Sequence, residues 1–195
     1  MPVKKEYAQV HPLTQDEWRD WLDANHDSQA GVWLVSFKAS TGKGRITWDE
    51  IVDEAICFGW IDSVQRTIDA ERTMQLITPR KTGSPWSALN KRRIERLEAE
   101  GRLAPAGIAK IDAAKRDGSW TAADAVEALT VPPDLAVALA ADTVAEANFA
   151  AFSPSARKGL LWWIHSAKRP ETRSKLIETI VTSAAQKVNH LASKD

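Results

Sequence analysis

Cysteine, excess charge of either sign and long apolar runs are all scarce in this chain of 195 residues. The one cysteine, Cys57, excludes a disulfide within the chain, and such a composition is typical of a reducing compartment. No apolar run approaches the roughly 20 residues that a membrane-spanning helix needs, and the first ten residues lack the apolar stretch of a signal peptide. We therefore expect a cytoplasmic protein that is not inserted in a membrane.

Motifs for cofactors and metals are also missing. The four histidines are scattered, with no pair at helical spacing and no cysteine cluster beside them, so a metal site is not expected. The sequence has no Walker motif, no dinucleotide-binding glycine pattern and no G-x-S-x-G. With 44% hydrophobic and 27% charged residues, it has the composition of a folded protein of one domain or two small ones. We expect no cofactor.

The formal net charge is zero, yet charges of one sign gather in successive blocks. Residues 1–77 have 8 basic and 13 acidic side chains, and residues 119–152 have 5 acidic and no basic ones. Residues 78–118 have 10 basic and 5 acidic side chains, and residues 153–195 have 8 basic and 3 acidic ones. Either neighbouring blocks neutralise each other across the surface, or the two basic blocks form a cleft.

Helix-capping signals occur twice in the first half of the chain. Thr14 and Thr47 each precede a glutamate by three residues, which is the spacing of a capping box. Helices are expected to begin at these threonines, and the second is expected to end at Gly59, which suits a left-handed residue. In the second helix Cys57 falls beside acidic residues and opposite the apolar stripe. Because nearby carboxylates disfavour a thiolate, Cys57 is not favoured as a nucleophile.

Three short segments rich in apolar residues and strand formers predict β-strands, at residues 32–37, 60–68 and 73–78. The last two are expected to form a hairpin around a polar turn of four residues. If Ile68 faces Thr73, the register places Asp62 and Ser63 beside Thr78 and Pro79. The hairpin would then bring the W-I-D-S stretch that begins at Trp60 alongside the basic stretch that follows the last strand.

From Ser84 onward the chain is predicted to be mostly helical. Ser84 is expected to cap a helix whose first residue is Pro85 and whose end is marked by Gly101. The expected fold is α+β, with a small antiparallel sheet and flanking helices followed by a mostly helical C-terminal half. We expect an α+β domain at residues 1–118 and a helical domain at residues 119–195.

Polar residues on the helix after Ser84 indicate a binding site. With side chains placed 100° apart, Asn90 and Arg93 fall inside the apolar stripe centred near Trp86, and buried polar groups need partners or a ligand. The expected helix start offers free backbone N–H groups close to Arg80, which suits an anion. With the hairpin register, this gives eight candidate residues for binding a small anionic or zwitterionic molecule: Trp60, Asp62, Arg80, Ser84, Trp86, Ser87, Asn90 and Arg93.

Three other interpretations stay open. The same residues could form a purely architectural network in which Asp62 pairs with Arg80 or Arg93. A hydrolase-like enzyme could use Asp62 as general base near one of the two serines, although no histidine lies in the motif; no catalytic residue is assigned. Basic and aromatic residues interleaved at 157–173 could serve a nucleic-acid or protein-interaction module, or form a solvated face. Zero net charge argues against nucleic acid as a partner without excluding it.

Four stretches of the sequence resemble a known bacterial family. They are L-V-S-F-K-A-S-T-G from Leu34, E-A-I-C-F-G-W-I-D-S from Glu54, T-P-R-K-T-G-S-P-W-S-A-L-N-K-R-R-I-E-R-L from Thr78 and S-A-K-R-P-E-T-R-S-K-L-I from Ser166. They resemble the YdeI/OmpD-associated family, also described as bacteriocin-protection proteins, over about residues 33–182. The resemblance implies a chain in two parts and protection from antimicrobial peptides or envelope stress. It implies no catalytic residue, no ligand identity and no oligomeric state.

Overall fold

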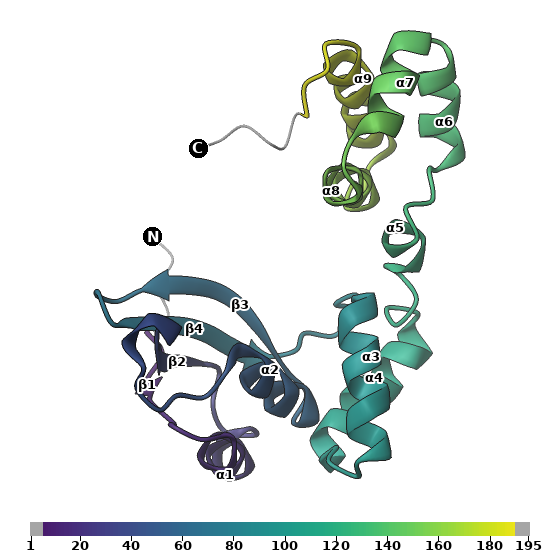
Figure 1. The fold of residues 1–195 in the computed structure, drawn as a ribbon. Coiled ribbons are helices and arrows are strands. Elements are labelled where there is room, and N and C mark those ends of the chain that lie inside the picture. Colours follow the sequence, from purple (N-terminus) through teal and green to yellow (C-terminus); the bar gives the residue numbers. More distant parts are fainter. Residues whose placement is uncertain (1–5, 190–195) are drawn as a thin grey trace. The chain divides into compact units, whose positions relative to one another are not determined.

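A computed structural model describes residues 6–189, and these residues divide into two compact units, one ending at Ala122 and the other beginning at Ala123. The first unit contains a sheet with flanking helices, and the second contains helices and their connections (Figure 1). The predicted α+β class with a mostly helical C-terminal half is therefore confirmed. Within residues 6–189, no helix has both the length and the apolar character needed to cross a membrane.

The elements of the first unit are β1 (Gln9–Val10), α1 (Gln15–Asn25), β2 (Val32–Phe37), the 3-10 turn η1 (Ala39–Thr41), α2 (Trp48–Cys57), β3 (Trp60–Thr67), β4 (Arg72–Pro79), α3 (Ala88–Ala99) and α4 (Pro105–Asp117). Those of the second unit are α5 (Asp124–Glu127), α6 (Pro133–Ala140), α7 (Thr143–Ala151), α8 (Pro154–His165) and α9 (Pro170–Ala185).

The sheet has the strand order β1-β2-β4-β3. The three predicted strands pair antiparallel, whereas the two-residue strand β1 joins the edge of β2 in parallel. Val32 and Leu34 of β2 and Ile77 of β4 are buried in one core with Trp18 of α1 and Ile51 of α2. Both helices thus cover the same face of the sheet (Figure 1), because apolar side chains at alternate strand positions share that face.

The β3–β4 turn is tighter than predicted. The N–H of Ile68 donates to the carbonyl of Arg72 over 3.0 Å, so Ile68 does not face Thr73. The physical reason is the side chain of Asp69, which accepts hydrogen bonds from the backbone amides of Glu71 at 2.9 Å and Arg72 at 2.7 Å. An aspartate that caps its own turn in this way draws the following residues together.

A second shift in the hairpin moves the residues at its far end. An irregularity in the ladder lies between Asp62 and Gln65, and it places Asp62 opposite Ile77. The predicted placement of Asp62 and Ser63 beside Thr78 and Pro79 is therefore wrong, and Ile61 and Trp60 take those places. A bulge of this kind leaves no periodic trace in the sequence, because it adds a residue to one strand only.

Helix α2 is buried on all sides, and the predicted single apolar stripe underestimates this burial. All residues from Ile51 to Cys57 are buried, including two carboxylates, whereas Trp48 at its start is 44% exposed. The helix contacts α1, β3, α3 and α4. Gly107 allows the approach of α4, since a Cβ atom there would lie 2.2 Å from the carbonyl oxygen of Cys57.

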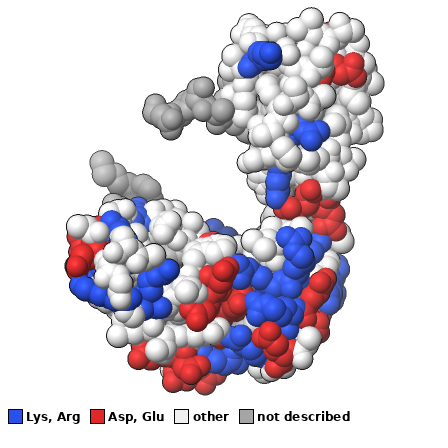
Figure 2. Space-filling model, in the orientation of Figure 1, with Lys and Arg blue, Asp and Glu red and all other residues white. Residues whose placement is uncertain are grey.

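The buried carboxylates of α2 pair with arginines from the surrounding segments. Glu54 contacts Arg19 of α1 at 2.7 Å and also contacts Arg102. Asp53 contacts Arg93 of α3 at 2.7 Å. These pairs offset the cost of burying a carboxylate. Acidic residues of the first charge block are thus neutralised by basic residues of the second, and charges of both signs alternate over the face of this unit seen in Figure 2.

Helix α3 begins later than predicted. Its N-cap is Ser87, whose hydroxyl accepts a hydrogen bond from the Asn90 amide at 3.2 Å, while Ser84 and Pro85 lie in the preceding loop. The prediction that Ser84 caps this helix is wrong. The carbonyl oxygens of Ser84 and Pro85 accept hydrogen bonds from Arg80, which holds these two residues in the loop.

The second unit is built around its own core. Leu135 of α6, Leu160 of α8 and Ile180 of α9 are among the buried residues of this cluster. Ser153 caps α8 by accepting a hydrogen bond from the Ala156 amide at 3.2 Å, as the Ser-Pro sequence predicts. Each unit therefore has a separate hydrophobic core.

Candidate functional site

A buried arginine follows the end of β4. The N–H of Arg80 donates to the carbonyl of Gly59 over 3.0 Å, which continues the hairpin by one residue. Its side chain turns inward and is only 3% exposed. The guanidinium carbon lies 3.6 Å from the ring centroid of Trp86, and Nη2 donates to the carbonyls of Ser84, at 3.4 Å, and Pro85.

The charge of Arg80 is not neutralised by a carboxylate among residues 6–189. Its Nε and Nη1 atoms are buried and have no hydrogen-bond partner there. Burial lowers the pKa of Arg80 to about 10, so the side chain is still protonated at neutral pH. A buried cation with free donors is costly unless an anion completes it.

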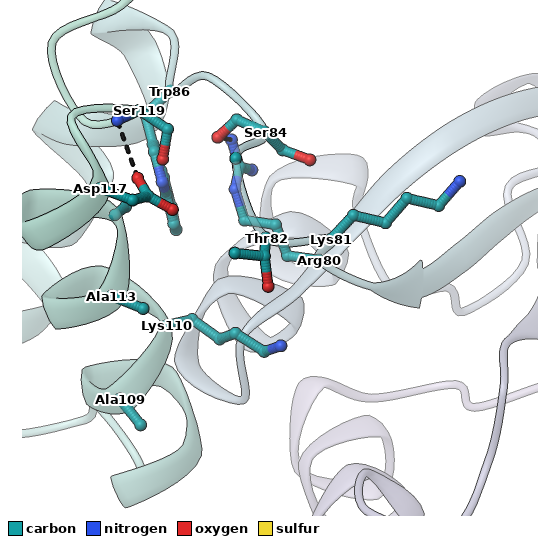
Figure 3. Close-up of a pocket in the computed structure, with 12 residues that line it drawn as sticks. Arg80, Lys81, Thr82, Ser84, Trp86, Ala109, Lys110, Ala113, Asp117 and Ser119 are labelled. Atoms are coloured by element: carbon teal, nitrogen blue, oxygen red, sulfur yellow. Dashed lines mark hydrogen bonds between the residues drawn. The ribbon is translucent and has the colours of Figure 1, made fainter.

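Arg80 lines a pocket of about 220 Å³ between the loop at residues 80–84 and helix α4 (Figure 3). Ala109 and Ala113, one turn apart on α4, have small side chains that leave space beside the loop. A Cβ atom on Gly59 would lie 2.6 Å from the Cγ atom of Lys110, so the alkyl chain of Lys110 packs directly against this glycine. The complete lining is Arg80, Lys81, Thr82, Gly83, Ser84, Trp86, Ala109, Lys110, Ala113, Ala114, Asp117 and Ser119.

Two residues at the end of α4 complete the polar lining. The Ser119 amide donates to Oδ1 of Asp117 at 2.9 Å (Figure 3). Ser119, through its side chain and its amide, lowers the pKa of Asp117, and the Gly83 amide and the charge of Arg116 contribute in the same direction. This carboxylate is therefore ionised at neutral pH, and it lines the pocket from the end of α4, opposite the loop.

The ring of Trp86 forms the apolar base of the pocket, and Trp120 packs against that ring from outside the lining. Trp86 is buried beneath Arg80, and its ring centroid lies 5.5 Å from that of Trp120. Lys91 and Lys115 lie over the Trp120 ring at 5.2 and 5.4 Å. A stacked arginine keeps its guanidinium plane in a fixed orientation, which leaves the direction of its remaining donors well defined.

The structure brings three of the eight predicted residues to this pocket, namely Arg80, Ser84 and Trp86. Ser87 lies next to them but caps α3, and Asn90 is half-buried in the first turn of that helix.

Trp60 and Asp62 of β3 do not line the pocket. Trp60 is a core residue whose Nε1 donates to the carbonyl of His26 at 3.2 Å and whose ring meets Trp21 edge-on. Asp62 accepts a long hydrogen bond of 3.5 Å from Gln75 across the ladder. Neither arginine that could have paired with Asp62 forms an ion pair with it in the described chain.

Arg93 is satisfied inside the protein. It contacts Asp53 at 2.7 Å and also Asp49, and its guanidinium carbon lies 5.1 Å from the ring centroid of Trp48. Arg93 is therefore paired with carboxylates of α2, and not with Asp62 as the architectural alternative would require. The physical reason is that α3 packs against α2, which supplies carboxylates that the sequence places 40 residues away.

Lys110, Asp117 and Ser119 were not predicted as site residues. Their segment contributes to the pocket only because α4 lies against the loop after β4. No strand register connects these two segments, so no spacing in the sequence relates them. An aspartate and a serine on either side of a helix-ending glycine were the available signal, and this combination is common at helix ends.

The basic and aromatic segment at residues 157–173 belongs to the second unit and is partly paired there. Lys158 contacts Glu127 at 2.7 Å, and Arg173 contacts Asp134 at 2.5 Å. Trp162 is 39% exposed and stacks on His165 with ring centroids 5.2 Å apart. Two of the cations are thus occupied by carboxylates, which weakens the interpretation of a nucleic-acid surface.

Cys57 is buried in the core of the first unit. Burial and, next, the charge of Glu54 raise the pKa of Cys57 to about 11. The thiol is therefore protonated at neutral pH, as expected for a structural cysteine.

Two family models match this chain, one in each unit. Residues 10–110, just over half of the chain, match the family described as Domain of unknown function (DUF8412), and residues 128–187 match the family described as Bacteriocin-protection, YdeI or OmpD-Associated. No curated protein and no solved structure matches the chain. The family resemblance noted in the sequence is confirmed for residues 128–187, which match the model described as Bacteriocin-protection, YdeI or OmpD-Associated. The chain belongs to the DUF8412 family, whose model matches residues 10–110.

Proposed function

We propose that the first unit binds a small anionic ligand in the pocket beside Arg80. The observation that carries this proposal is the unpaired charge of that side chain. The other buried charged residues of the described chain, Asp53, Glu54 and Arg93, all form ion pairs with opposite charges. Arg80 is thus the one buried charged residue of the described chain that lacks an oppositely charged partner, and it lines a pocket. An anion bound from solution would supply that partner.

The pocket supplies donors for such an anion. The free Nη1 of Arg80 is a charged donor, and a hydrogen bond from a charged group contributes about 1.5 to 3 kcal/mol. Lys110 adds a second cation from α4, and Ser84 adds a hydroxyl from the loop. The volume of about 220 Å³ suits a small metabolite.

Ligand-dependent stabilisation tests the proposal. Thermal unfolding is measured in chloride buffer with increasing inorganic phosphate or acetate, for the wild type, Arg80→Gln and a control, Arg92→Gln, whose arginine is exposed on α3. A ligand present at 100 times its Kd stabilises the folded state by about 2.7 kcal/mol. We expect saturable stabilisation in the wild type and the control and its loss in Arg80→Gln. An equal response of all three proteins would contradict an Arg80 site.

We further propose that ligand binding contributes to protection against antimicrobial peptides, the role that the description of the second unit's family names. A strain without the gene is complemented with wild type, Arg80→Gln or Arg92→Gln at matched expression, and survival under a bacteriocin is counted. Protection by the wild type and the control but not by Arg80→Gln is expected. Full protection by Arg80→Gln would show that ligand binding in the pocket is not needed for protection. Cytoplasmic location is part of the proposal, and cell fractionation tests it.

A further inference from the structure

We infer that the ligand of this pocket is a small zwitterion, whose anionic group lies at Arg80 and whose ammonium group lies at Asp117. This inference rests on the proposed function, because it names the ligand class for the same pocket. The observation behind it is that two side chains of opposite charge line one pocket of about 220 Å³ and yet form no ion pair with each other in the described chain. The space between them is where a ligand with both charges fits.

Asp117 is held as a charged acceptor. The Ser119 amide donates to its Oδ1 at 2.9 Å. The proximity of Ser119, together with the Gly83 amide, keeps the pKa of the carboxyl low. These donors are neutral and orient the carboxylate without cancelling its charge, and Arg116, whose charge also lowers this pKa, forms no ion pair with Asp117 among the described residues. A ligand ammonium group would be the cation that this carboxylate lacks.

Helix α4 presents a cation and an anion to the pocket, Lys110 and Asp117. Lys110 and Asp117 are seven residues apart, which corresponds to two helical turns and about 10 Å along the axis, and both line the pocket (Figure 3). A simple anion on Arg80 would be repelled by the carboxylate of Asp117. In a molecule with an ammonium group a few bonds from its anionic group, the ammonium group would be attracted by Asp117 while the anionic group binds Arg80.

An isosteric pair of probes tests this inference. 2-Aminoethylphosphonate and propylphosphonate differ in having an ammonium or a methyl group at the same position. Their Kd values are measured by calorimetry at pH 7.5 for the wild type, Asp117→Asn, Arg80→Gln and the control Asp112→Asn, whose carboxylate is exposed on α4 outside the pocket lining. Asparagine keeps an oxygen that can accept the Ser119 amide, so the contact at the end of α4 is retained.

The wild type and Asp112→Asn are expected to bind the aminophosphonate about threefold to fivefold more tightly, as for an ion pair near the surface. Asp117→Asn should bind both probes equally, and Arg80→Gln should lose both. Equal binding of the two probes by the wild type, or a preference that survives in Asp117→Asn, would overturn the zwitterion inference and leave anion binding intact. Failure of both probes to bind the wild type would overturn the proposed function as well.

Discussion

The guanidinium carbon of Arg80 lies 3.6 Å from the ring centroid of Trp86, so this buried cation rests on an aromatic ring and not beside a carboxylate. Stacking of this kind is worth about 1 to 2 kcal/mol, and a charged hydrogen bond about 1.5 to 3 kcal/mol. Against these stands a desolvation cost of several kcal/mol for the charge. The terms nearly cancel, which distinguishes Arg80 from an arginine whose role is purely structural.

We therefore predict that Arg80→Met changes the free energy of unfolding by less than about 1 kcal/mol. Methionine fills the space over Trp86 and removes the buried charge, although the carbonyls of Ser84 and Pro85 lose their donor. Urea denaturation without added anions measures the change. A decrease of about 3 kcal/mol in the free energy of unfolding would mean that Arg80 mainly stabilises its loop through hydrogen bonds.

Arg93→Met, in contrast, is predicted to lower the free energy of unfolding by about 2 to 3 kcal/mol. The substitution leaves the buried Asp53 with only Arg96, which contacts its Oδ2 at 2.5 Å, and breaking a buried pair strands the remaining charge. Arg92→Met, at an exposed position of the same helix, is the matched control and should change stability by under about 0.5 kcal/mol. If both substitutions cost the same in urea denaturation, the α2–α3 ion pairs do not stabilise the fold.

The start of α3 can be located by removing hydroxyl groups. Ser87→Ala deletes the side chain that accepts the Asn90 amide and is expected to cost about 1 kcal/mol. Ser84→Ala, in the preceding loop, is expected to cost much less, since Ser84 supplies Arg80 with a backbone carbonyl and not with its hydroxyl. Thermal denaturation of the two variants gives the comparison. The reverse order of stability would place the cap at Ser84.

Cys57 makes stability depend on alkaline pH. Because burial raises its pKa in the folded state from 9.0 to about 11, the folded protein holds the thiol proton more tightly than the unfolded chain. This contribution is complete below pH 9 and is lost as pH rises from 9 to 11, by about 2 kcal/mol. Denaturation at pH 8 and pH 11 should show the wild type losing that much more stability than Cys57→Ala, which lacks the titrating group. Parallel losses in both proteins would place the thiol in contact with water.

Local sequence signals were the reliable part of the prediction. Thr47 caps α2 with a complete capping box, and Gly59, with φ of 72°, ends it. The hairpin was recognised, but its register was not, since the side chain of Asp69 tightens the turn. Of the proposed site, Arg80, Ser84 and Trp86 line the pocket, because they are close together in the chain.

What the sequence by itself determined about this protein is the main helices, three of the four strands of the described sheet, the α+β class and the family of the second unit. The reason is that caps, glycine stops and apolar periodicity act within a few residues. Only the tertiary structure decided which arginine is left without a carboxylate. Arg93 meets Asp53 across 40 positions of the chain, whereas Arg80 faces α4, whose small side chains leave a pocket there. Charge pairing depends on which helices pack together, and packing is settled by burial of whole faces rather than by any local pattern.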